Sequence, residues 1–134
     1  MQRYVRIESI TFDGTALPLP MSLRLSRRTQ PLPATGEGEV FATSVQMGAA
    51  TIGAKVRLRG VAAAEDMTLG RCGQLTGVIS AADGSHNRTV RLDRAVLVAV
   101  EHAYEQSTTA SAVLRFVAEA PDGSEEPFAV EETP

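Results

Sequence analysis

The sequence predicts a mostly β domain, an antiparallel β-sandwich or barrel with one short flanking α-helix and one long loop between strands. Short segments alternate apolar with polar residues, which is typical of strands that have one buried face. Asp-Gly pairs, which favour tight turns, recur at 13–14, 83–84 and 122–123. The 134 residues, 43% of them hydrophobic, have the length and composition of one globular domain, residues 1–134.

Alternation and turn positions predict the individual strands. In 21–28, Leu23 and Leu25 alternate with Arg24 and Ser26. Valines at positions 96, 98 and 100 favour a strand over a helix for 95–104. We expect one hairpin around the segment ADGSHN and a second that pairs 95–104 with 110–119. The predicted strands are 3–12, 21–28, 40–47, 51–59, 74–81, 88–93, 95–104, 110–119 and 127–130.

Three segments depart from this pattern. Residues 61–69, VAAAEDMTL, favour a short helix because alanine is the best helix former and Gly70 follows as a cap. Residues 29–44 are expected to form an extended loop or arm, since 29–39 carry two prolines and two glycines without periodicity. The acidic end, 131–134, is expected to be a flexible tail.

The residue types argue against catalysis and metal binding. His86 falls in a predicted turn and His102 in a predicted strand, where solvated or hydrogen-bonded histidines are usual. Cys72 is the single cysteine, which excludes an internal disulfide and a multi-cysteine metal site. The segments DGSHNRT and DGSEE lack the spacing of a calcium loop, and GEGE lacks that of a phosphate-binding loop. We therefore expect no enzyme, no metal and no cofactor.

Charge is unevenly divided along the chain. Residues 1–60 hold eight Lys and Arg against four Asp and Glu, whereas residues 61–134 hold five against twelve. The net charge of −3 argues against a dedicated nucleic-acid clamp. The opposite halves either form solvated strand faces or let the basic half of one copy meet the acidic half of another. Such a contact joins two different surfaces, so it closes into rings or grows into stacks.

No run of about 18 apolar residues predicts a membrane span, and the N-terminus lacks the apolar core of a signal peptide. These observations indicate synthesis in the cytoplasm.

The order of features between residues 55 and 128 resembles the tail tube proteins of tailed bacteriophages and prophage-like elements. A short helix ending at glycine precedes a strand, an Asp-Gly hairpin, a strand with an AVLV run, a strand with an LxFxA run and a terminal DGxxxPF segment. In this chain the pieces are Leu69-Gly70, Asp83-Gly84, Ala95 to Val98, Leu114/Phe116/Ala118, Asp122-Gly123 and Pro127-Phe128.

The resemblance implies a virion protein that is made in the host cytoplasm and assembles into stacked, commonly hexameric rings of the tail. DNA would pass through the lumen without specific binding, and the partners would be other copies and other tail proteins. Residues 29–44 would be the arm that reaches neighbouring subunits, stiffened by its prolines. The expected subunit interface consists of Arg27, Arg28, Pro31, Pro33, Glu37, Glu39 and Phe41.

Two alternatives remain open. The chain resembles in composition other virion components with a β domain, namely a tail terminator, a head–tail joining protein or a capsid-decorating protein. A carbohydrate- or other ligand-binding β-sandwich is the alternative of a different class. The aromatic content of 4% disfavours it, because sugar sites depend on aromatic platforms.

Overall fold

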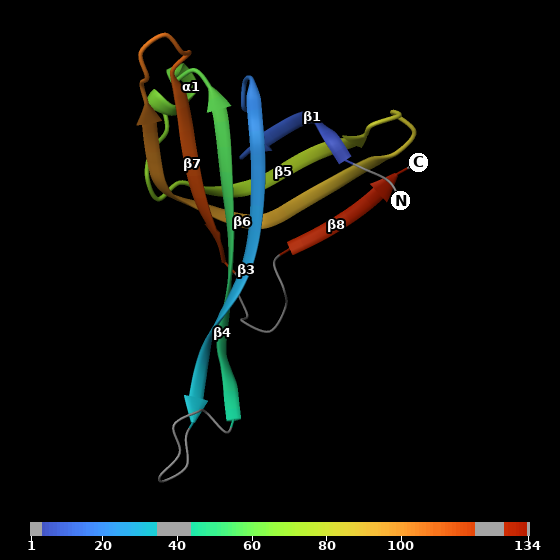
Figure 1. Cartoon of the computed structure of the whole chain (residues 1–134), viewed down its shortest axis with the longest axis vertical. Helices are drawn as coiled ribbons and strands as arrows, with labels where there is room; N and C mark the ends of the chain where they lie inside the picture. Colours follow the sequence, from blue (N-terminus) through green and yellow to red (C-terminus); the bar gives the residue numbers. More distant parts are fainter. Residues whose placement is uncertain (1–3, 35–43, 120–127, 134) are drawn as a thin grey trace.

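The structure of the chain is a computed structural model that describes residues 4–34, 44–119 and 128–133. It is mostly β, as the sequence predicts, with eight antiparallel strands and very little helix among the described residues (Figure 1). The elements are β1 (Tyr4–Phe12), β2 (Thr15–Ala16), β3 (Pro20–Ala34), β4 (Ser44–Arg59), α1 (Ala62–Glu65), β5 (Cys72–Ala81), β6 (Asn87–Ala103), β7 (Ser111–Ala118) and β8 (Phe128–Thr133).

The strands form one open sheet that folds over itself as a sandwich. Their order is β2-β1-β5-β6-β7-β4-β3, with β8 paired to β6, and the sheet does not close into a barrel. The two layers share β6. Residues 87–92 pair with β5 and β8, and residues 95–103 pair mainly with β7. We call β2, β1, β5, β8 and the start of β6 the first layer, and the end of β6 with β7, β4 and β3 the second layer.

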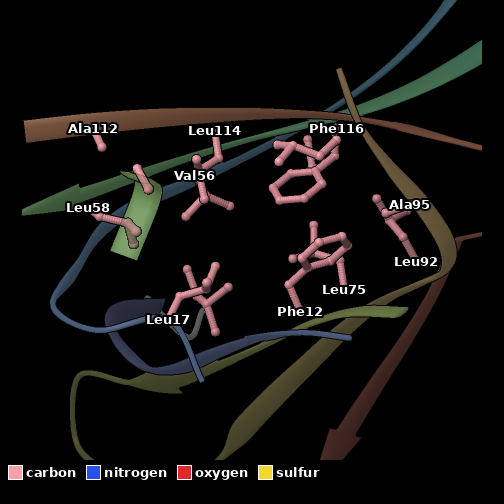
Figure 2. Packing of buried hydrophobic residues seen from close by; sticks show 14 of the residues in the cluster. Phe12, Leu17, Val56, Leu58, Leu75, Leu92, Ala95, Ala112, Leu114 and Phe116 are labelled. Carbon is pink, nitrogen blue, oxygen red and sulfur yellow. The ribbon is translucent and has the colours of Figure 1, made fainter. Parts of the chain in front are cut away.

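The apolar faces of the two layers meet in one core (Figure 2). Phe12 of the first layer and Phe116 of the second are each 1% exposed, and their ring centroids are 4.8 Å apart. Around them lie the other fully buried large side chains, which are Ile10, Val56, Leu58, Leu92, Leu97 and Leu114. Packing between layers therefore holds the sandwich together.

Two pairs of predicted strands are single strands in the structure. Segments 88–93 and 95–104 are the two halves of β6, and segments 40–47 and 51–59 fall within β4 and the residues before it. In β6 the register opposite β5 shifts between Gly73 and Leu75, so two residues, Asp93 and Arg94, lie opposite one. Such a β-bulge bends a strand without ending it, and alternation in the sequence breaks there. Both predicted hairpins are confirmed.

The predicted helix and tail are shorter than expected. Helix α1 spans one turn, Ala62–Glu65, in place of 61–69. Val61 provides no side-chain cap, and a helix this short gains little from propensity alone. At the other end, Glu131–Thr133 continue β8 instead of forming a flexible tail, because they pair with Thr89, Arg88 and Asn87 of β6.

We predict that Phe116→Ala destabilises the protein by about 3–5 kcal/mol, because it leaves a cavity opposite Phe12. Val98→Ala is the control, since Val98 is 49% exposed and its truncation costs about 0.5 kcal/mol or less. Urea denaturation followed by circular dichroism measures both. Equal costs for the two variants would contradict the packing of the layers.

Candidate functional site

A two-stranded ribbon projects from the body of the sandwich. Strands β3 and β4 pair from Pro20↔Leu58 to Ala34↔Ser44, but β7 pairs with β4 only from Gly53 onward. The segments 28–34 and 44–51 therefore pair only with each other among the described residues, and Figure 1 shows them extending past the sheet. We call these segments the ribbon. An isolated two-stranded hairpin is marginally stable in water, so contact with a neighbour would stabilise this one.

The ribbon corrects part of the expected loop at 29–44. Residues 29–34 belong to β3, and Ser44 begins β4. Pro31 and Pro33 are tolerated because β3 is an edge strand. The two prolines are two residues apart, so their nitrogens point to the same side of the strand, which can be the unpaired side. The arm exists, but in its described part it is a paired ribbon and not a loop.

The expected interface residues are divided by the structure. Arg27 and Arg28 pair with Ile52 and Thr51 where the ribbon joins the body, and both are exposed. Pro31 and Pro33 lie on the ribbon, opposite Met47 and Val45. Glu37, Glu39 and Phe41 lie outside the described residues.

The second layer carries a basic outer face. Alternation in β4 buries Val56 and Leu58 and turns Lys55, Arg57 and Arg59 outward. In β3 the outward residues include Arg24 and Arg28, and in β7 they include Arg115. We call these six residues, Arg24, Arg28, Lys55, Arg57, Arg59 and Arg115, the basic face.

Three of these cations lie directly side by side. Arg24 pairs with Lys55 across β3 and β4, and Lys55 pairs with Arg115 across β4 and β7. Neighbouring strands are about 4.8 Å apart, and like charges directly opposite each other are destabilising. Within the described residues, Arg115 has an ion pair with Glu101 at 3.5 Å, while no carboxylate pairs with Arg24 or Lys55. The arrangement thus costs stability that a bound anion would restore.

The basic face is hollowed at Gly53. This glycine precedes Lys55 by two positions on the same face of β4 and pairs with Ser26 and Val117. The hollow has a volume of ≈ 380 Å³. Four cations and two hydroxyl side chains are among the residues that line it, namely Arg24, Arg28, Lys55, Arg115, Ser26 and Thr51.

The sequence predicts polar strand faces for most of these cations, but it singles out neither Arg115 nor their juxtaposition. The alternation in 21–28 and 51–59 places Arg24, Lys55 and Arg57 on solvated strand faces. The register that brings Arg24 and Arg115 to either side of Lys55 depends on pairing between segments about 30 and 60 residues apart. The sequence signal that could have predicted this cluster is that the polar faces of 21–28 and 51–59 both carry positive charge.

The second layer also has two free edges among the described strands. Strand β3 pairs with β4 alone, and β6 beyond Leu97 pairs with β7 alone. The outward residues near the β3 edge include Arg24 and Arg28, whereas Glu101 is outward on the β6 edge. The β3 edge is therefore basic, and the β6 edge carries a carboxylate that Arg115 of the same chain also contacts.

The predicted chemical candidates are not assembled into a site. Cys72 is exposed and unpaired with another cysteine, and the His102 ring contacts the Tyr104 hydroxyl at 3.5 Å. No three His, Cys, Asp or Glu residues in the described ranges are grouped so that they could hold a metal ion. Nor does any described helix have the length and apolar character needed to cross a membrane.

Comparison with known proteins gave no match: neither a protein-family model nor a curated sequence matches the chain. The ribbon, the free edges and the basic face are therefore the features from which function is argued.

We predict that Lys55→Glu stabilises the fold by about 0.5–1 kcal/mol at low salt, because it places a carboxylate between Arg24 and Arg115. Lys55→Gln, which only removes repulsion, should have a smaller effect. Urea denaturation at 20 mM and 1 M NaCl measures the difference, which should shrink at high salt (the Debye length is about 3 Å at 1 M). Destabilisation by Lys55→Glu would contradict the register.

The Asp83 turn gives a second prediction. Hydrogen bonds from the Ser85 hydroxyl (2.6 Å) and backbone amide (3.0 Å) to the Asp83 carboxylate hold the pKa of Asp83 below its ordinary value. The turn is therefore most stable above the ordinary pKa of Asp83, and this contribution is lost as pH falls through the lowered one. Ser85→Ala should raise the pKa of Asp83 in an NMR titration, and an unchanged pKa would contradict this turn.

Proposed function

We propose that the chain is a structural subunit that assembles with copies of itself, and that the assembly is the tail tube of a bacteriophage or prophage-like particle. The observation that carries the proposal is the ribbon. It presents two strands whose outer edges are unpaired among the described residues, and exposed edges are templates for pairing with another chain.

The free edges of the second layer support a head-to-tail contact between copies. If β3 of one copy lies beside the end of β6 of the next, Arg24 and Arg28 approach Glu101 on the outer face. On the inner face, half-buried Leu23 and Leu25 approach half-buried Val100. Charge and apolar character then match on both sides of the joined sheet. A contact between two different edges closes into a ring or extends as a stack.

The resemblance to tail tube proteins supports the particular identity. Three of its pieces occupy ordinary positions in the fold: Asp83-Gly84 forms the β5–β6 turn, Ala95–Val98 opens the second half of β6, and Leu114 and Phe116 are core residues of β7. In a tube that lets DNA slide, the basic face would point away from the lumen. A head–tail joining protein is the second candidate, and the basic face favours it if DNA contacts that face, because six cations would hold DNA instead of letting it slide.

Replacing residues 30–49 with Asn-Gly should abolish assembly and keep the fold. Thr29 and Ala50 are already paired, so a two-residue turn can join them, and the core around Phe12 and Phe116 is retained. Light scattering and negative-stain electron microscopy measure assembly, and circular dichroism measures the fold.

The matched control inserts Gly-Ser after Asp83, in the exposed β5–β6 turn, where assembly should be unchanged. Rings or tubes formed by the ribbon-deleted variant would contradict the role of the ribbon. A wild-type chain that stays monomeric at all concentrations, under crowding and with a nucleating complex would contradict the proposal itself. Stacked tubes of many rings would support the tube, and single rings the joining protein.

A further inference from the structure

We propose that the basic face binds the phosphodiester backbone of double-stranded nucleic acid, with the hollow at Gly53 as the seat for one phosphate group. The inference does not depend on self-assembly, because all six cations belong to one chain. If this face lined the lumen of a ring, binding to phosphates would make the ring hold DNA instead of letting the DNA slide.

The hollow has the components of an anion seat. Arg24, Lys55 and Arg115 form a row on one side of Gly53, and Arg28 lies on the other side. Ser26 and Thr51 add hydroxyl donors within the same hollow. Arginine provides planar, paired donors that match phosphate oxygens, and its charge persists at every pH of interest.

The cations continue beyond the hollow in a way that suits a polymer. Lys55, Arg57 and Arg59 alternate along β4, so successive outward side chains are about 6.7 Å apart. Each cation beyond the hollow can contact a further phosphate of a polymer, whereas a single small anion in the hollow cannot reach these cations. This favours a phosphate backbone over free phosphate as the ligand.

The composition of the face favours nucleic acid over an acidic protein. Protein interfaces have an apolar centre from which charged residues are depleted, whereas protein–DNA interfaces are more polar and strongly positive. The hollow is central to this face, and its one exposed large hydrophobic neighbour among the described residues is Val98.

The same composition favours a duplex over a single strand. Single-strand sites stack bases on exposed aromatic rings, but the one aromatic residue that borders the hollow, Phe116, is 1% exposed. Contacts to phosphates give affinity that does not depend on sequence, and this is the binding that the proposal assigns to the basic face.

Net charge does not exclude this binding. The chain carries −3 overall, but the Debye length at physiological salt is about 8 Å, so a phosphate at the hollow senses mainly the nearby cations. The inference therefore revises the expectation that net charge sets the partner.

The test measures binding of the full chain to a fluorescent 20-base-pair duplex by anisotropy between 50 and 200 mM NaCl. With about three phosphate contacts, one at the hollow and one each at Arg57 and Arg59, log K should fall against log salt with a slope of about −2.7, a loss of roughly 40-fold across this range. Arg24→Gln/Lys55→Gln, which removes two cations from the seat of one phosphate, should reduce the steepness by about 0.9 and weaken binding at 50 mM salt by roughly tenfold.

Two variants serve as controls. Arg6→Gln/Arg91→Gln removes the same net charge from the first layer, where both arginines pair with acids, and should change affinity less than about twofold. Gly53→Val keeps every cation and fills the hollow. A Cβ at Gly53 would meet contacts at 3.4 Å, and circular dichroism checks that the two γ-methyl groups of valine leave the fold intact. The salt dependence of Gly53→Val should be shallower by about 0.9, which corresponds to the loss of one phosphate contact.

Three outcomes would overturn the proposal. The first is equal duplex binding by the Arg24/Lys55 double variant and the wild type, or no duplex binding at 50 mM salt. The second is tighter binding of poly-glutamate than of duplex at matched salt, which would assign the face to an acidic protein. The third is displacement of the duplex by inorganic phosphate at a concentration equal to that of the duplex phosphate groups, which would assign the hollow to a small anion. If the ribbon-deleted variant binds the duplex with the same affinity and salt dependence as the wild type, binding is independent of assembly.

Discussion

The bend in β6 is the constraint on which the rest of the structure depends. One strand of 17 residues serves both layers, and it can do so only because Asp93 and Arg94 form a bulge opposite a single residue of β5. Ion pairs flank the bend, between Arg91 and Asp93 at 3.1 Å and between Arg94 and Glu119 at 3.3 Å. On either side, Leu92 and Ala95 are buried. The bend thus places the two apolar faces opposite each other and brings Phe12 over Phe116.

The sequence predicts the local structure of this chain well, because alternation and turn chemistry are local signals. It predicts the mostly β class, the Asp83-Gly84 hairpin and the pairing of β6 with β7. It divides β6 in two because alternation breaks at Asp93, and it extends α1 because Ala-rich composition says nothing about tertiary support. Prolines and glycines suppress the strand signal, so the sequence predicts a loop where β3 and β4 form part of the ribbon, although edge strands tolerate proline.

The candidate site was harder to predict, for a different physical reason. Each cation of the basic face is visible in the sequence on a polar strand face, but the field that they produce arises from register between distant segments. Arg24, Lys55 and Arg115 are neighbours only because β3, β4 and β7 are consecutive in the sheet. The net charge of the whole chain hides this cluster, because it also counts acids that lie elsewhere, such as Glu65 at the end of α1 and Asp66 after it. The charge density at one place on the sheet depends on which strands are neighbours, and in this fold those neighbours come from distant parts of the sequence.

The ribbon also differs from the sandwich in local stability. Each of its strands pairs on one side only among the described residues, whereas β4 pairs on both sides from Gly53 onward, so the ribbon's free energy of opening should be smaller than that of the sandwich. Amide protons of β3 and β4 should therefore divide into a slowly exchanging segment beside β7 and a rapidly exchanging segment beyond Gly53. A partner that docks on the ribbon meets a segment that still has to be immobilised, and part of the association energy is spent on that ordering. Growth would then be slow to begin and faster once one docked subunit presents an ordered template to the next.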